Sequence, residues 1–95
     1  MTDRLDQERQ RGINARLLLE TPLLVEAFET TKDEYVKAWR DAPARDTEGR
    51  ERLWMMVKLL DKVKAHLETV MSGGQLAEKE LTDLQERGKL RRLFG

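Results

Sequence analysis

One apolar repeat constrains the fold of this chain more than any other feature. Between residues 47 and 72, apolar side chains recur at alternating spacings of three and four residues: Leu53, Met56, Leu60, Val63, Leu67 and Val70. This is the period of one helix face, sustained over nearly three heptads. Val57, Leu59 and Met71 widen the stripe beyond a narrow coiled-coil seam. The pattern predicts a long helix that packs against other helices.

The preceding segment predicts a second helix beside the first. Proline fits the first helical position, so Thr21-Pro22 indicates a helix start, and Pro43 indicates the end of that helix. Asp46 or Thr47 is the expected cap of the next helix. No stretch alternates apolar and polar residues over a strand's length. We therefore predict an all-α fold built on an antiparallel helical hairpin of residues 21–41 and 47–72.

Two weaker helices are expected to flank this hairpin within a single helical domain of 95 residues. Residues 3–20 have a poor apolar pattern, and Gly12 costs about 1 kcal/mol relative to alanine in a helix, so residues 1–15 are expected to be mobile or ordered only by a partner. Gly73-Gly74 is expected to end the long helix, because glycine accepts the left-handed conformation of a helix C-terminus. A short helix over 75–87 and a tail over 88–95 then follow.

The composition leaves little room for catalysis. The absence of cysteine excludes disulfides, thiol catalysis and thiolate metal sites, and the single histidine, His66, excludes multi-histidine zinc sites. We predict that the protein is not an enzyme, has no catalytic residues, and binds neither a cofactor nor a metal. No apolar run approaches the roughly 20 residues of a membrane span, so no membrane contact is expected.

Self-association and partner binding are the remaining functions. The apolar arcs of the two hairpin helices are wider than one antiparallel neighbour covers. We therefore expect a homo-oligomer formed through Leu53, Met56, Leu60, Val63, Leu67 and Val70. The residues from 87 onward carry four basic and no acidic side chains between leucines, which suits either a docking segment or one that folds back onto the core. The expected partner-binding residues lie in this tail and near the loop between the hairpin helices: Arg91, Arg92, Leu93, Phe94, Arg45, Arg50 and Trp54.

Four segments carry a resemblance to known proteins: LETPLLVEAF (19–28), AWR (38–40), ARDTEGRERLW (44–54) and KVKAHLE (62–68). Together they resemble a group of short helical proteins that tailed bacteriophages and proteobacterial prophages encode near structural and DNA-packaging genes. The resemblance spans about residues 16–82 and carries over no catalytic residue. It implies a viral or prophage origin and a location in the bacterial host cytoplasm or the virion.

These observations predict a phage or prophage accessory protein without enzymatic activity. It would self-associate and bind another phage or host protein through its helical surfaces and its tail. Two alternatives remain: a DNA-packaging subunit of the small-terminase kind, and an inhibitor of a host enzyme. Eighteen basic residues balance eighteen acidic ones and no helix-turn-helix is evident, so nucleic-acid binding is possible but not favoured. The sequence does not separate the inhibitor from the accessory protein.

Overall fold

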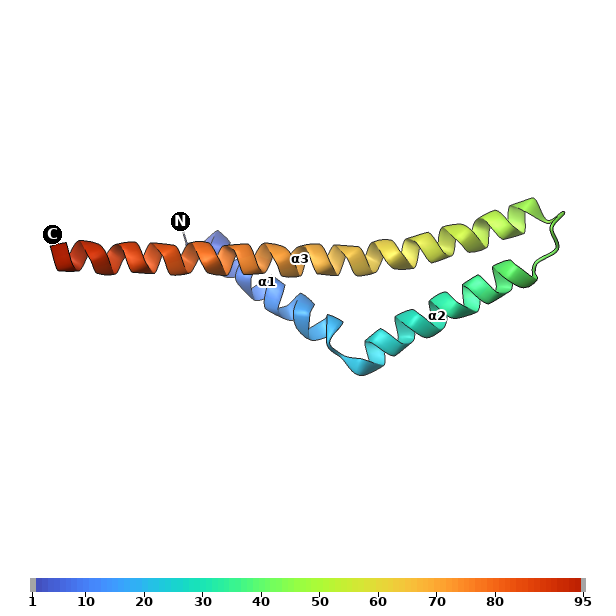
Figure 1. Cartoon of the computed structure of the whole chain (residues 1–95), viewed down its shortest axis with the longest axis horizontal. Coiled ribbons are helices and arrows are strands. Elements are labelled where there is room, and N and C mark those ends of the chain that lie inside the picture. The colour runs from blue at the N-terminus through green and yellow to red at the C-terminus, as the bar shows by residue number, and fades with distance from the viewer. Residues whose placement is uncertain (1, 95) are drawn as a thin grey trace. The chain divides into compact units, whose positions relative to one another are not determined.

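The described part of the chain folds into three α-helices: α1 (Asp3–Leu19), α2 (Pro22–Asp41) and α3 (Thr47–Phe94) (Figure 1). The structure is a computed structural model that describes the backbone of residues 2–94 and the side chains of residues 2–93. No strand occurs within these bounds, which confirms the all-α class. The chain divides into two compact units. Unit 1 contains α1 up to Leu17 and the part of α3 from Leu67 onward, and unit 2 contains residues 18–66.

The predicted end of the long helix at Gly73-Gly74 is wrong. Helix α3 runs for 48 residues, from Thr47 to Phe94, without the separate helix expected over 75–87. A glycine that ends a helix commonly adopts a positive φ, and no glycine in the described part of the chain does so. The backbone of 88–94 is likewise helical, so the break expected at Gly88 is also absent.

A close contact within unit 1 explains why glycine stands inside a helix at positions 12 and 74. A Cβ atom added to Gly12 of α1 would lie 2.5 Å from the Cα of Gly74, and one added to Gly74 would lie 2.6 Å from the Cα of Gly12. Both distances are far below van der Waals contact, so the two backbones meet where neither residue has a side chain. Ala15 and Ala77, each three residues further along its helix, are buried beside this contact. We call it the glycine crossing.

The ends of the helices in unit 2 follow the predicted signals. Pro22 is the first residue of α2, after an extended Thr21. The amide of Ala42 donates to the carbonyl of Ala38 (3.0 Å) where α2 ends. Asp46 precedes α3, and its Oδ1 accepts from the amide of Gly49 (3.1 Å), which satisfies one exposed donor of the first turn. The helix expected over 3–20 is also confirmed, as α1, whereas the mobility of residues 1–15 stays a prediction.

The buried core is small in both units. Among the described side chains, four apolar ones are buried: Leu5, Ala15, Val57 and Ala77. Three of them belong to unit 1, and Val57 is the single one in unit 2. Many large apolar side chains are exposed instead: Leu17, Leu18, Leu23, Trp54, Met55, Met56, Leu59, Val63, Leu76, Leu84, Leu90 and Leu93. This imbalance determines which surfaces are candidates for interaction.

Candidate interaction surfaces

An arginine links the end of α2 to the start of α3. The Nη1 of Arg50 donates to the carbonyls of Trp39 (3.0 Å) and Ala42 (3.1 Å). In a continuous helix the carbonyl of Trp39 would accept from the amide of residue 43, but that residue is Pro43, which has no N–H. Arg50 supplies the missing donor, and its positive charge lies where the helix dipole is negative. The guanidinium carbon of Arg50 also lies 4.5 Å from the centre of the Trp39 ring.

Two tryptophans extend this arrangement along unit 2. The ring centres of Trp39 and Trp54 are 6.0 Å apart with a tilt of 43°, and the Nζ of Lys58 lies 5.1 Å from the centre of the Trp54 ring. Arg50, Trp39, Trp54 and Lys58 thus alternate cations with aromatic rings, an arrangement that cation–π attraction favours. We call these four residues the tip cluster. They hold the end of α2 against α3.

The residues predicted to bind a partner near this loop have different surroundings. Arg50 is part-buried, and its guanidinium is engaged within unit 2. Arg45 is exposed. Trp54 packs near Trp39 but remains 47% exposed, beside an open hollow of about 330 Å³ lined by Trp39, Arg50, Glu51 and Trp54. Arg45 and Trp54 are therefore available to a partner, whereas Arg50 positions the loop.

The six residues predicted to join two copies do not share one environment. Leu53 and Leu60 are half-buried in unit 2, on the same side of α3 as the buried Val57. Met56 and Val63 are exposed. The remaining two, Leu67 and Val70, are half-buried in unit 1. Their contacts with a second copy stay a prediction.

A second apolar face of α3 lies away from α2. It consists of Met55, Met56, Leu59 and Val63, which are 62%, 41%, 55% and 45% exposed. At 100° per residue, Met55 lies 160° and Leu59 lies 200° around the helix from Val57. We call these four residues the open face. Met55 was not singled out from the sequence and Leu59 only as a widening of the stripe, although Met55, Leu59 and Val63 follow one another at spacings of four residues. The exposed Arg52 lies on the same side of the helix.

The end of α3 presents charged and apolar groups together. Arg91, Arg92, Leu90 and Leu93 are all exposed, so the two leucines are not folded into the core of unit 1. The side chain of Phe94, predicted to bind a partner with them, lies outside the described side chains. The tail is thus a helical end with accessible leucines and arginines, rather than an irregular segment.

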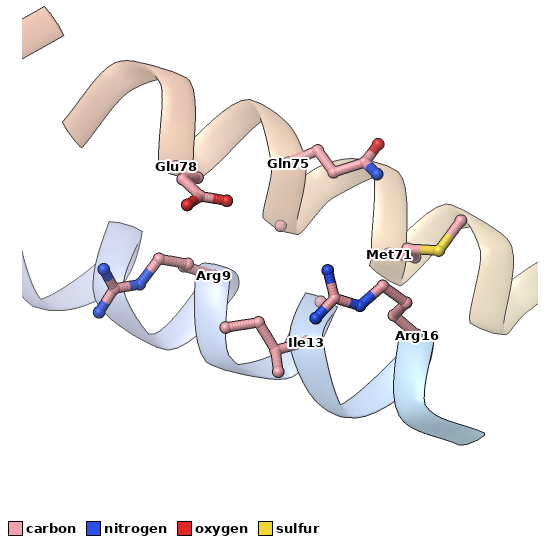
Figure 2. Close-up of a pocket in the computed structure, with 8 residues that line it drawn as sticks. Arg9, Ile13, Arg16, Met71, Gln75 and Glu78 are labelled. Atoms are coloured by element: carbon pink, nitrogen blue, oxygen red, sulfur yellow. The ribbon is translucent and has the colours of Figure 1, made fainter. Parts of the chain in front are cut away.

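A narrow cleft follows the glycine crossing in unit 1 (Figure 2). Its walls are Arg9, Gly12, Ile13 and Arg16 of α1 and Met71, Gly74, Gln75 and Glu78 of α3. The cavity measures about 30 Å³, which is room for about one water molecule and far below the roughly 300 Å³ at which ligand sites begin. The buried Nε of Arg9 has no hydrogen-bond partner among the described residues. The cleft is a packing feature of the crossing.

Within the described part of the chain, no group of three or more His, Cys, Asp or Glu side chains is placed to hold a metal ion. None of the described helices is long and apolar enough to cross a membrane. Comparison of the chain with protein-family models, curated proteins and solved structures finds no significant match.

Proposed function

We propose that this protein is a non-enzymatic assembly protein that self-associates and binds a second protein. The observation that carries the proposal is the scarcity of buried apolar side chains: four are buried, while twelve large ones are exposed in the described part of the chain. Exposed apolar side chains are normal when scattered singly, but contiguous ones mark interaction sites. Three members of the open face, Met56, Leu59 and Val63, follow one another at helical spacing.

In this proposal, α2 and the first part of α3 form an antiparallel hairpin that a second copy completes. The ring contact between Trp39 and Trp54 supports the pairing near the loop. The ion pair between the Nζ of Lys32 and the Oδ1 of Asp61 (2.8 Å) supports it further from the loop. Because both charged side chains are about half exposed, this pair contributes at most about 1 kcal/mol, so apolar contacts must supply most of the stability.

The second protein would bind at the end of α3. Exposed leucines flanked by Arg91 and Arg92 suit a groove with an apolar floor and an acidic rim, because a few anchors supply most of the affinity of such contacts. The resemblance of residues 16–82 to helical proteins of tailed phages supports a phage or prophage accessory role, in the host cytoplasm or the virion. The partner is then another phage protein or a host protein.

Light scattering tests self-association directly. At micromolar concentration and physiological salt, we expect a mass of at least twice 11.1 kDa. A monomer that melts cooperatively under the same conditions would refute the proposal, because its exposed apolar surface would then need no partner. Affinity capture from infected cells with the full chain, compared with a chain lacking residues 89–95, tests the second protein. Equal capture by both chains would exclude the tail as the binding site.

A further inference from the structure

Gly73 and Gly74 form the weakest point of α3 by local propensity. In a helix interior glycine is about fivefold less favourable than alanine, so the pair lowers helix formation by about 25-fold. Ser72, directly before the pair, favours helix ends and turns over helix interiors. Helix α3 nevertheless passes through all three residues, and neither glycine has a positive φ. Contacts from outside this segment must therefore hold the helix together here.

Helix α1 bridges the glycine pair within unit 1 (Figure 2). On one side of the pair, a Cβ added to Gly12 of α1 would lie 3.2 Å from the carbonyl oxygen of Val70. On the other side, Ala77 is buried, and Glu78 shares the narrow cleft with Arg9 of α1. A break at the pair would separate one of these sides from α1. The seated α1 therefore opposes a break in α3.

Packing alone does not account for the glycine at position 73. Gly74 is buried and must lack a side chain, because a Cβ there would lie 2.6 Å from the Cα of Gly12. A Cβ added to Gly73 would meet no other part of the described chain within 4 Å. The glycine crossing thus requires one glycine in α3, and α3 has two in succession. Gly73 weakens the helix at this point without improving its contact with α1.

We infer that the seating of α1 decides whether α3 is one helix or two. With α1 in place, α3 runs through Gly73 and Gly74; when α1 is released, the helix ends at this pair, as the local sequence favours. The two events are coupled, so a change that favours the unbroken helix also strengthens the docking of α1. A partner that displaced α1 would thereby redirect the exposed residues 82–93. The device requires no second copy of the chain and is independent of the proposed function.

Hydrogen exchange of the α1 amides tests the coupling, because a side chain added at position 73 would not touch α1. Gly73→Ala favours the unbroken helix by about fivefold. If α3 breaks when α1 is released, the amides of the buried residues Gly12 and Ala15 should exchange up to about fivefold more slowly in this variant. Gly88→Ala is the matched control: its Cβ also meets nothing within 4 Å of the described chain, but it lies among the exposed residues after Leu81. It should leave the exchange of the α1 amides unchanged.

A distance within α3 tests the break itself. The chain has no cysteine, so Glu68→Cys combined with Glu86→Cys places one pair of spin labels at exposed positions. Five complete turns of helix separate these two positions, so an unbroken helix holds the labels about 27 Å apart with a narrow distribution of distances.

Displacing α1 should change this distribution. The valine of Gly12→Val would overlap the backbone of Gly74, so in the labelled chain it should broaden the distribution and shift it to shorter distances. Adding Gly73→Ala to this variant should narrow the distribution again. Gln7→Val, at an exposed position of α1, is the matched control and should leave the distribution as in the parent chain.

Three results would overturn the inference. Unchanged exchange of the α1 amides in Gly73→Ala would show that α3 stays unbroken when α1 leaves. Equal slowing by Gly73→Ala and Gly88→Ala would show that α1 exchanges only when the whole chain unfolds. A narrow distribution near 27 Å in a folded Gly12→Val chain would show that α3 does not depend on α1. The exchange measurement decides the question even if Gly12→Val fails to fold, because Gly73→Ala favours the helical state.

Discussion

Adjacent glycines of α3 are expected to respond in opposite ways to the same substitution. Gly73 and Gly74 both lie inside the helix, where alanine is better than glycine by about 1 kcal/mol. A Cβ added to Gly73 meets nothing within 4 Å, so Gly73→Ala should gain this amount. A Cβ added to Gly74 meets the Cα of Gly12 at 2.6 Å and the carbonyl oxygen of Glu8 at 3.0 Å. Gly74→Ala therefore gains the same helix propensity, but its new methyl group would displace α1 at the glycine crossing.

The magnitude follows from comparing the two variants. Because the gain in helix propensity is common to both, the difference in the free energy of unfolding between Gly73→Ala and Gly74→Ala is the steric cost at the crossing. The obstructing atoms belong to the backbone, which cannot rotate aside as a side chain does. Overpacking of this kind costs about 1–3 kcal/mol. A domain of this size shifts its melting midpoint by about 4–8 °C per kcal/mol, so the two variants should differ by at least about 4 °C.

Thermal unfolding followed by circular dichroism measures this difference. All variants must be compared at one protein concentration, since association would make the midpoint depend on concentration. Gly12→Ala should behave like Gly74→Ala, because its Cβ would meet the Cα of Gly74 at 2.5 Å. If Gly74→Ala were as stabilising as Gly73→Ala, the close approach of α1 and α3 would not exist in solution.

Three further changes test other contacts. Arg50→Ala should lower the free energy of unfolding by about 2–3 kcal/mol, because two carbonyls lose a charged donor; a loss below about 0.5 kcal/mol in chemical denaturation would contradict the role we assign to this side chain. Val57→Ala should cost about 1–3 kcal/mol at the one buried side chain of unit 2, whereas Leu23→Ala should stay within about 0.5 kcal/mol of the parent chain. Deletion of residues 89–95 should reduce helical circular dichroism slightly, move the melting midpoint by less than about 2 °C, and abolish capture of the second protein; a large fall in the midpoint would show that the tail belongs to the core.

The periodic and punctuation signals of the sequence were sufficient to predict the fold class. The apolar spacing from Leu53 to Val70 identified the long helix, Pro22 identified the start of α2, and Asp46 identified the cap of α3. Each of these signals acts within a few residues of the chain, so it does not depend on what packs nearby. The extent of α3 was not predicted, because it depends on α1, which is distant in the sequence.

Gly12 and Gly74 show why separation in the sequence limits such predictions. Gly12 was taken as a weak point of one helix and Gly74 as the end of another, and each interpretation uses local propensity alone. In the structure they are the two halves of one contact, and each is required because of the other. A pattern was present that local reasoning does not weigh: in both helices an alanine, Ala15 or Ala77, follows the glycine after three residues. Small residues at matched spacing in two helices indicate a close crossing, but only once the helices are considered as a pair.

The tip cluster differs from the glycine crossing, because part of it could have been derived from local rules. Pro43 was used only as the stop of α2. A proline four residues after Trp39 also leaves the carbonyl of Trp39 without its usual donor, so it can accept from a side chain elsewhere. Arg50, in the first turn of the next helix, reaches back and supplies that donor. Its chemistry was recognised in the sequence but assigned to an outside partner. The missing amide of Pro43 thus accounts for the position of the Arg50 guanidinium, which is engaged within unit 2, whereas Arg45, the exposed part of Trp54 and Lys58 beside it stay accessible.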